Sequence, residues 1–336
     1  MEHSVAERLQ NSDDPSVRYV YYRDCCDGGL ADLTDLRIRI KDSTRIHKML
    51  DLRKPDGGLP WHAYAKWRGA FWTLLMLADL GYPEADSSLI PLKDQVMDWL
   101  LDEARLKRVP LIDGRWRRCA LQESGAVYSI LKLGLVEPRL ERLVELLLKW
   151  QWPDGGWNCD KKPSASHSSF YESFIPLRGM NAYAMATGDP RVKTAVDRDA
   201  EMFQSRHLFR RLADGRVILD AFTQLAYPPY WHYDILTALT AMHEIGRLDD
   251  SRCAEALDLL ESKRLPDGGF AADVKYYRVT QRETTGVSPV DWGPVGNTKM
   301  NEFVTVRALG VLHHAGRISA EPFQLGFVLD ERSALG

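Results

Sequence analysis

Four acidic residues recur at equivalent places in the sequence, where predicted helices begin. They are Glu123, Glu172, Asp234 and Glu302, in the segments Gln122-Glu123-Ser124, Tyr171-Glu172-Ser173, Tyr233-Asp234-Ile235 and Asn301-Glu302-Phe303. Carboxyl groups in an apolar, mutually repelling site have raised pKa values, so one of the four could be protonated near neutral pH. We expect general acid catalysis, with Asp234 or Glu302 as the proton donor and Glu172 and His232 in support.

These acids also have a purely structural interpretation. Acidic side chains in a first helical turn are stabilised by the helix dipole and by free backbone N–H groups. Either role is open for any one of them, and the recurrence of four favours a shared catalytic rim that includes Glu123.

Other side chains near the same helix starts could bind a substrate. We expect this of His62, Lys66, Trp67, Tyr171, Tyr233, Asn301 and, from a long irregular segment, Trp292. His232 stands next to Asp234 and could be an oriented acid or base, or a hydrogen-bonded, partly buried histidine. Lys66 could bind an anionic group, or lie solvated at a helix start.

The sequence has no motif for a metal or a cofactor, and we expect neither. It lacks Cys-x-x-Cys and His-Glu-x-x-His spacing, although Cys159, Asp160 and His167 share one predicted loop. A carboxylate ring with His232 could hold a hard or borderline cation, which stays open as an alternative. Gly-rich phosphate cradles are absent.

Composition limits the class of protein. The chain has 336 residues, of which 45% are hydrophobic and 27% charged, and its net charge is −3. This charge gives no electrostatic support to nucleic-acid binding, and no apolar run is long enough to span a membrane. An odd number of cysteines, five, and the absence of signal-peptide features indicate a reduced, cytoplasmic protein.

A repeated turn organises the elements that must position the acids. Pro-Asp-Gly-Gly occurs at 55–58, 153–156 and 266–269, and weaker Asp-Gly turns occur at 113–114 and 214–215. Each lies between amphipathic segments, which is typical of a helix-pair repeat. The repeat predicts inner helices at 16–26, 71–80, 119–133, 168–187, 231–245 and 298–315, and outer helices at 36–50, 92–106, 138–150, 190–206, 250–263 and from about Ser319.

Six helix pairs predict an all-α protein, an (α/α)6 toroid that forms one domain over residues 1–336. Gly81, Gly134, Gly188, Gly246 and Gly316 follow inner helices, where a left-handed C-cap favours glycine. Residues 270–297 lack helical periodicity, and we expect an active-site or lid loop there. An open solenoid of similar repeats is the structural alternative.

The segment Gln151-Trp152…Gly156-Trp157 resembles the QW repeat of squalene–hopene cyclases. Asp160-Lys161-Lys162-Pro163…Phe170-Tyr171-Glu172 is similar to a segment of the protein prenyltransferase β subunit. The resemblance, over residues 13–317, implies an (α/α)6 barrel with a large apolar cavity and an isoprenoid-like substrate. In the cyclases the catalytic acid stands before a Thr-Ala segment. By this resemblance Asp234, which precedes Thr237-Ala238, has the place of that acid.

The chain lacks the characteristic catalytic motifs of both families. The acidic Asp-x-Asp-Asp motif of the cyclases is missing. The nearest match, Asp197-Arg198-Asp199, lies on a predicted outer helix and not at the rim of the ring. The prenyltransferase zinc site does not carry over, because Glu172 stands in the place of its histidine and no Asp-x-Cys pair occurs.

Three functions follow from the sequence. The first is a terpene cyclase-like enzyme, an isomerase or lyase, that cyclises, isomerises or hydrates an apolar small molecule in the barrel. The second is a carbohydrate-processing (α/α)6 enzyme with paired carboxylates and aromatic platforms. The third is a non-catalytic binding scaffold. The oligomeric state is not indicated.

Overall fold

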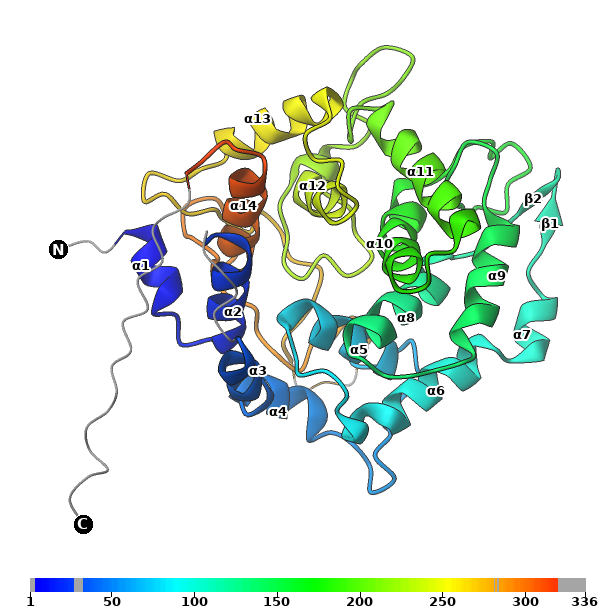
Figure 1. The fold of residues 1–336 in the computed structure, drawn as a ribbon, viewed down its shortest axis with the longest axis horizontal. Coiled ribbons are helices and arrows are strands. Elements are labelled where there is room, and N and C mark those ends of the chain that lie inside the picture. Colours follow the sequence, from blue (N-terminus) through cyan, green and yellow to red (C-terminus); the bar gives the residue numbers. More distant parts are fainter. Residues whose placement is uncertain (1–3, 27–32, 281, 283, 320–336) are drawn as a thin grey trace.

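The ring is built from inner helices surrounded by outer ones, as Figure 1 shows along its axis. The computed structural model describes residues 4–26, 33–280, 282 and 284–319. In this part of the chain the inner helices are α2 (Pro15–Asp24), α5 (Ala70–Leu80), α8 (Leu121–Lys132), α10 (Phe170–Thr187), α12 (Ile235–Glu244) and α14 (Glu302–His314). Each contacts the next, and α14 contacts α2, which closes the ring.

The outer layer follows the predicted alternation. It consists of α3 (Thr34–Lys41) with α4 (Thr44–Leu50), α6 (Ile90–Leu100), α9 (Leu140–Trp150), α11 (Pro190–Gln204) and α13 (Ala254–Ser262). The (α/α) toroid that the sequence predicts is therefore confirmed. The outer helix expected after Ser319 lies outside the described residues, whereas α1 (Val5–Gln10), which was not predicted, packs on the outside of α2.

Shorter elements occupy the connections. They are the helix α7 (Glu103–Lys107), the 3₁₀ turns η1 (Ser87–Leu89), η2 (Asp220–Thr223) and η3 (Ser251–Cys253), and a hairpin of β1 (Leu111–Ile112) and β2 (Arg115–Trp116). No helix in the described residues is both long and apolar enough to cross a membrane.

The Pro-Asp-Gly-Gly turns share one backbone geometry. In each, the residue just before the motif donates its N–H to the last glycine carbonyl at 2.8 Å: Lys54 to Gly58, Trp152 to Gly156 and Leu265 to Gly269. The first glycine of each copy has a positive φ, which L side chains rarely adopt. The five glycines predicted as C-caps also have positive φ, so that prediction is confirmed.

The centre of the ring is packed with aromatic side chains. Trp72 is fully buried, and its ring lies 4.8 to 5.6 Å from the rings of Tyr64, Trp67, Phe71 and Tyr230. Since the inner helices run parallel, the ring has an N-terminal mouth, where they begin, and a C-terminal mouth, where they end.

The described residues of the segment 270–297 form an irregular loop at the N-terminal mouth. Gly286 donates to the Lys66 carbonyl, Trp67 donates through its backbone to Val287, and the Trp67 indole donates to the Tyr276 carbonyl at 2.8 Å. These bonds attach the loop to the segment that leads into α5.

Candidate functional site

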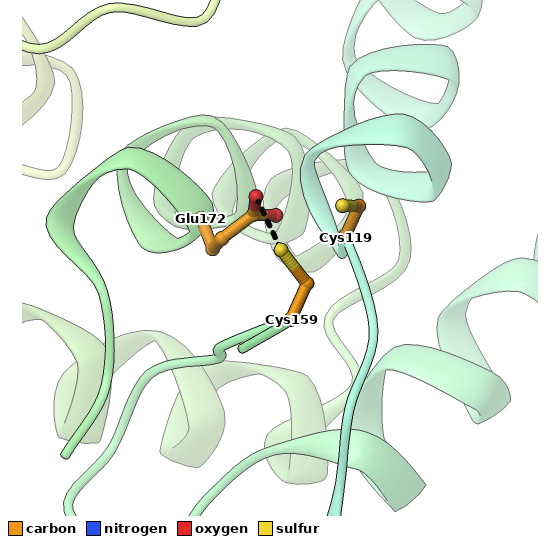
Figure 2. A group of neighbouring side chains, drawn as sticks. All are labelled: Cys119, Cys159 and Glu172. Atoms are coloured by element: carbon orange, nitrogen blue, oxygen red, sulfur yellow. Dashed lines mark hydrogen bonds between the residues drawn. The ribbon is translucent and has the colours of Figure 1, made fainter. Parts of the chain in front are cut away.

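Two thiols and a carboxyl group meet at the N-terminal mouth. Cys119 precedes α8, Cys159 lies in the loop before α10, and Glu172 is in the first turn of α10. Figure 2 shows the three side chains directed toward one another, with Cys159 Sγ 3.2 Å from Glu172 Oε1. All three ligand atoms lie within 4.8 Å of one another. We call this group the thiol–carboxyl cluster.

Backbone hydrogen bonds hold the two loops of the cluster together. Arg118 donates its N–H to the Asn158 carbonyl at 3.1 Å, which joins the segment of Cys119 to that of Cys159. Trp157 donates its N–H to Ser173 Oγ at 3.0 Å, and Ser169 donates to the Trp157 carbonyl at 2.8 Å. The Cys159 loop is thus attached directly to the first turn of α10.

The helices α8 and α10 approach closely behind the cluster. A Cβ at Gly179 of α10 would lie 2.3 Å from the Ser124 carbonyl of α8, so only glycine fits there. This contact brings the starts of the two helices, and with them Cys119 and Glu172, side by side.

Glu172 is a buried carboxyl group without a neutralising partner. The residue is 8% exposed, and its Oε2 has no hydrogen-bond partner. Burial raises its pKa well above the usual range, and the negative charge of Cys159 adds to the effect. A buried polar atom without a partner marks a place where a ligand or an ordered water binds.

The two thiols have different acidities. A hydrogen bond with Cys119 lowers the pKa of Cys159 to about 6, and the same contact together with burial raises the pKa of Cys119. Tyr64 lies beside Cys119 and Glu172, and burial raises the pKa of its hydroxyl. Both cysteines are partly exposed, so the cluster is accessible from the mouth.

Glu123 is near Glu172 but is held by arginines. It is fully buried, forms a very short ion pair with Arg118, and accepts from Arg105 at 3.1 Å. Burial raises its pKa, and the charge of Arg118 opposes that effect. Two cations therefore neutralise Glu123, whereas Glu172 has none in direct contact.

Asp234 and Glu302 lie away from the cluster. Asp234 caps α12, where its carboxylate accepts from the N–H of Thr237 at 2.7 Å and of Ala226 at 3.1 Å. Burial raises its pKa to about 6. Glu302 accepts from Ser12 Oγ at 2.8 Å and lines a separate charged groove of about 620 Å³ with Asp14 and Arg45.

Aromatic and basic side chains surround the mouth. His232 is stacked between Trp231 and Tyr276, with ring centroids 3.8 and 3.4 Å away, and burial lowers its pKa to about 4. Tyr171 contacts Trp231 edge-on at 5.7 Å, and Lys66 Nζ lies 5.0 Å from the Trp231 ring centre. Trp231 Nε1 has no hydrogen-bond partner.

The remaining predicted binding residues divide between surface and core. His62 is exposed and contacts Trp99, and Trp67 is buried in a stack with Tyr230 at 3.9 Å. Tyr233 donates its hydroxyl to the Leu208 carbonyl at 2.6 Å and is buried.

Trp292 and Asn301 connect the long loop to α14. Trp292 is buried and donates its indole N–H to Ser288 Oγ at 3.1 Å. Asn301 caps α14 and donates to the Trp292 carbonyl at 2.9 Å.

A polar cavity of about 500 Å³ lies at the opposite, C-terminal mouth. All six inner helices described contribute to its lining, and Arg178 bridges Asp79 at 3.0 Å and Glu244 at 2.7 Å. The pKa of Asp79 is lowered, because the charges of Arg178 and Arg307 outweigh the effect of its burial. Arg178 forms ion pairs with both acids, and the lowered pKa makes Asp79 a poor proton donor.

Comparisons with known proteins show similarity of fold. No family model matches the sequence, and no curated protein matches it. A solved polysaccharide lyase is 15% identical, with 93% of this chain and 96% of that chain covered and a TM-score of 0.50. A GH76 alpha-mannanase from Bacteroides thetaiotaomicron is 12% identical (93% and 92% covered, TM-score 0.49), and a glycosyl hydrolase of family 88 from Bacteroides vulgatus is 14% identical (94% and 98% covered, TM-score 0.47).

The resemblance to squalene–hopene cyclases and protein prenyltransferases is therefore wrong. The solved structure that is similar in fold at a TM-score of 0.50 is that of a polysaccharide lyase. The expected isoprenoid-like, apolar substrate is wrong as well. The ring centre is packed, and the cavity at the C-terminal mouth is lined by charged groups. The Gln-Trp and Gly-Gly-Trp residues have a structural role in this turn: Gln151 donates to the Gly155 and Ala195 carbonyls, and the Trp157 indole donates to the Leu147 carbonyl.

Proposed function

We propose that this protein is a carbohydrate-processing enzyme whose substrate binds at the N-terminal mouth of the ring. The observation that carries the proposal is the combination of partly exposed aromatic rings with a neighbouring buried carboxyl group that no cation neutralises. The polysaccharide lyase of similar fold makes a glycan the first substrate class to test.

The aromatic rings supply the binding surface. Trp231, Tyr171 and Tyr276 are partly exposed and come from different segments of the chain. Sugars present C–H faces that pack on aromatic rings, while their hydroxyl groups need polar partners at the ring edges. The ammonium group of Lys66, a partly exposed residue, supplies a hydrogen-bond donor next to the Trp231 ring.

The thiol–carboxyl cluster supplies the reacting centre. Cleavage of a glycosidic bond needs a proton donor or a Lewis acid at the departing oxygen. Tyr64, which is partly exposed, lies beside Glu172 and Cys119, so an aromatic residue borders the cluster. The acid pair at the C-terminal mouth does not fit this role, because Arg178 binds both of its members.

Glycan binding to variants tests the location of the substrate. Trp231→Ala and Tyr171→Ala should each weaken binding of a retained polysaccharide about tenfold, measured by affinity electrophoresis and calorimetry. Lys132→Ala is the matched control, because Lys132 is exposed and lines the cavity at the other mouth. If Lys132→Ala abolishes binding and the aromatic variants bind normally, the N-terminal mouth is the wrong place.

A further inference from the structure

We infer that Cys119, Cys159 and Glu172 form a binding site for a zinc ion that keeps one coordination position open toward the mouth. The site goes beyond the proposed function, because zinc binding itself does not require a sugar substrate. Three features of the cluster favour zinc: the ligand geometry, the unpaired oxygen of Glu172 and the local charge.

The distances suit a tetrahedral ion. Zinc binds thiolates at about 2.3 Å and carboxylate oxygens at about 2.0–2.2 Å, which places neighbouring ligand atoms roughly 3.5–3.8 Å apart. In this structure Cys159 Sγ and Glu172 Oε1 are 3.2 Å apart, and no pair among the three ligand atoms exceeds 4.8 Å. Small side-chain movements are enough to bring all three ligands to one ion.

The second observation is the unpaired oxygen. Glu172 is more than nine-tenths buried, its Oε1 contacts Cys159, and its Oε2 has no partner. Figure 2 shows this carboxyl group directed at the two sulfur atoms. A cation between the three groups would satisfy Glu172 Oε2, which is otherwise buried without a hydrogen bond.

The surrounding charges fit an anionic metal centre. Two thiolates, one carboxylate and a divalent ion carry a net charge of −1. Arg118 and Arg105 contact the single carboxylate of Glu123, which leaves one positive charge next to the cluster. The charge of Arg118 acts on both Cys119 and Glu172.

The donor set favours zinc among common ions. Soft thiolates select zinc over magnesium or calcium, which prefer oxygen ligands. Structural zinc sites have four protein ligands, whereas catalytic sites have three and hold water or substrate in the fourth position. Among the described residues this is the one group of three or more such ligands at these distances, so the open position fits a catalytic site.

If the proposed function holds, the ion would act at the sugar. A zinc ion here could polarise the departing oxygen or lower the pKa of a bound water. Tyr64, beside Cys119 and Glu172, would then border the open position.

Metal loading of the whole protein tests the inference. Metal-free protein with reduced thiols is incubated with zinc, dialysed and measured by elemental mass spectrometry, and a parallel sample receives cobalt(II). We expect one zinc per chain and a near-ultraviolet thiolate-to-cobalt charge-transfer band. Cys119→Ser, Cys159→Ser and Glu172→Gln should each weaken zinc binding by at least about 100-fold, since even outer-shell changes cost 10- to 100-fold. Asp160→Asn, at an exposed acid next to Cys159, should bind zinc normally.

Two results would overturn the inference. One is wild-type protein that retains no stoichiometric zinc, including the case in which Cys119 and Cys159 form a disulfide and the reduced protein still binds none. The other is a cobalt spectrum without the thiolate band, a reading that needs no variant. Zinc binding without any action on glycans would leave the metal site intact and count against the proposed function alone.

Discussion

At the residue scale, Glu172 and Glu123 have the same position in their helices but opposite surroundings. Each is the third residue of its helix, and both are buried. Glu123 contacts two arginines, whereas Glu172 contacts a thiol and keeps one oxygen unpaired. Their spacing in the sequence does not distinguish the two acids, because Arg118 lies in the loop before α8 and Arg105 in α7.

Substitution by glutamine distinguishes a catalytic role of Glu172 from a structural role of Glu123. Glu172→Gln should lower turnover by about 10²- to 10⁴-fold and leave the free energy of unfolding unchanged or slightly higher. Glu123→Gln should lower the free energy of unfolding by about 3 kcal/mol, because it leaves two arginines facing a neutral group. Denaturant titration and product formation measure the two effects. Equal loss of stability in both variants would contradict the distinction.

The sequence does not predict that Cys119 and Cys159 lie close together. Cys119 and Cys159 are far apart in the chain and follow no metal-binding spacing. Their proximity depends on the Arg118–Asn158 hydrogen bond and on the close approach of α8 and α10 at Gly179. These are tertiary contacts between helix pairs, which hydrophobic periodicity does not specify.

At the element scale, periodicity predicts the helices well but not the direction of each acid. Glu302 is the first residue of α14, Asp234 is the N-cap of α12, and Glu123 and Glu172 are third residues. Each residue of an α-helix rotates by about 100° from the last, so a shift of one or two positions turns a side chain elsewhere. The four acids consequently do not converge as a single rim.

The cap of α14 also holds the long loop. Asn301 accepts from the N–H groups of Phe303 and Val304 and donates to the Trp292 and Pro294 carbonyls. Asn301→Ala should lower the free energy of unfolding by about 2 kcal/mol. Asn301→Asp keeps the cap and loses the donors, so it should cost less and should mainly increase hydrogen exchange around Trp292. Unchanged exchange in both variants would show that the cap does not fix the loop.

Asp199 on α11 gives a pH-dependent prediction. It is fully buried, neither oxygen has a partner, and burial followed by the charge of Asp154 raises its pKa well above the usual range. The folded protein therefore binds this proton more tightly than the unfolded chain. The stability that the proton confers is complete below the ordinary pKa near 3.8 and is lost as pH rises through the folded value.

Asp199→Asn should remove this loss. Relative to wild type, its free energy of unfolding should increase progressively as pH rises above the ordinary pKa of 3.8. Asp197→Asn is the matched control on the same helix, because Asp197 is ion-paired with Lys193 and Arg247 and its pKa is lowered. Parallel pH profiles for wild type and Asp199→Asn would contradict the assignment.

At the scale of the whole molecule, the closed ring creates two mouths with different chemistry. The C-terminal mouth gathers acids and arginines that neutralise one another around Arg178. The N-terminal mouth gathers aromatic rings and the thiol–carboxyl cluster. The repeated turns predict the ring correctly, because glycine and aspartate specify their geometry locally. They do not predict the filling of the ring centre, which depends on how Trp72 and its neighbours pack.

The most direct test of the account is the formation of saccharide products. Purified protein, with and without added zinc, is incubated with a panel of neutral and acidic polysaccharides, and products are identified by mass spectrometry. We expect wild-type protein to release new oligosaccharides from at least one polysaccharide, and folded Glu172→Gln to release none. If wild type releases no product from any member of the panel and binds none of them, the assignment of a carbohydrate-processing site to the N-terminal mouth is contradicted.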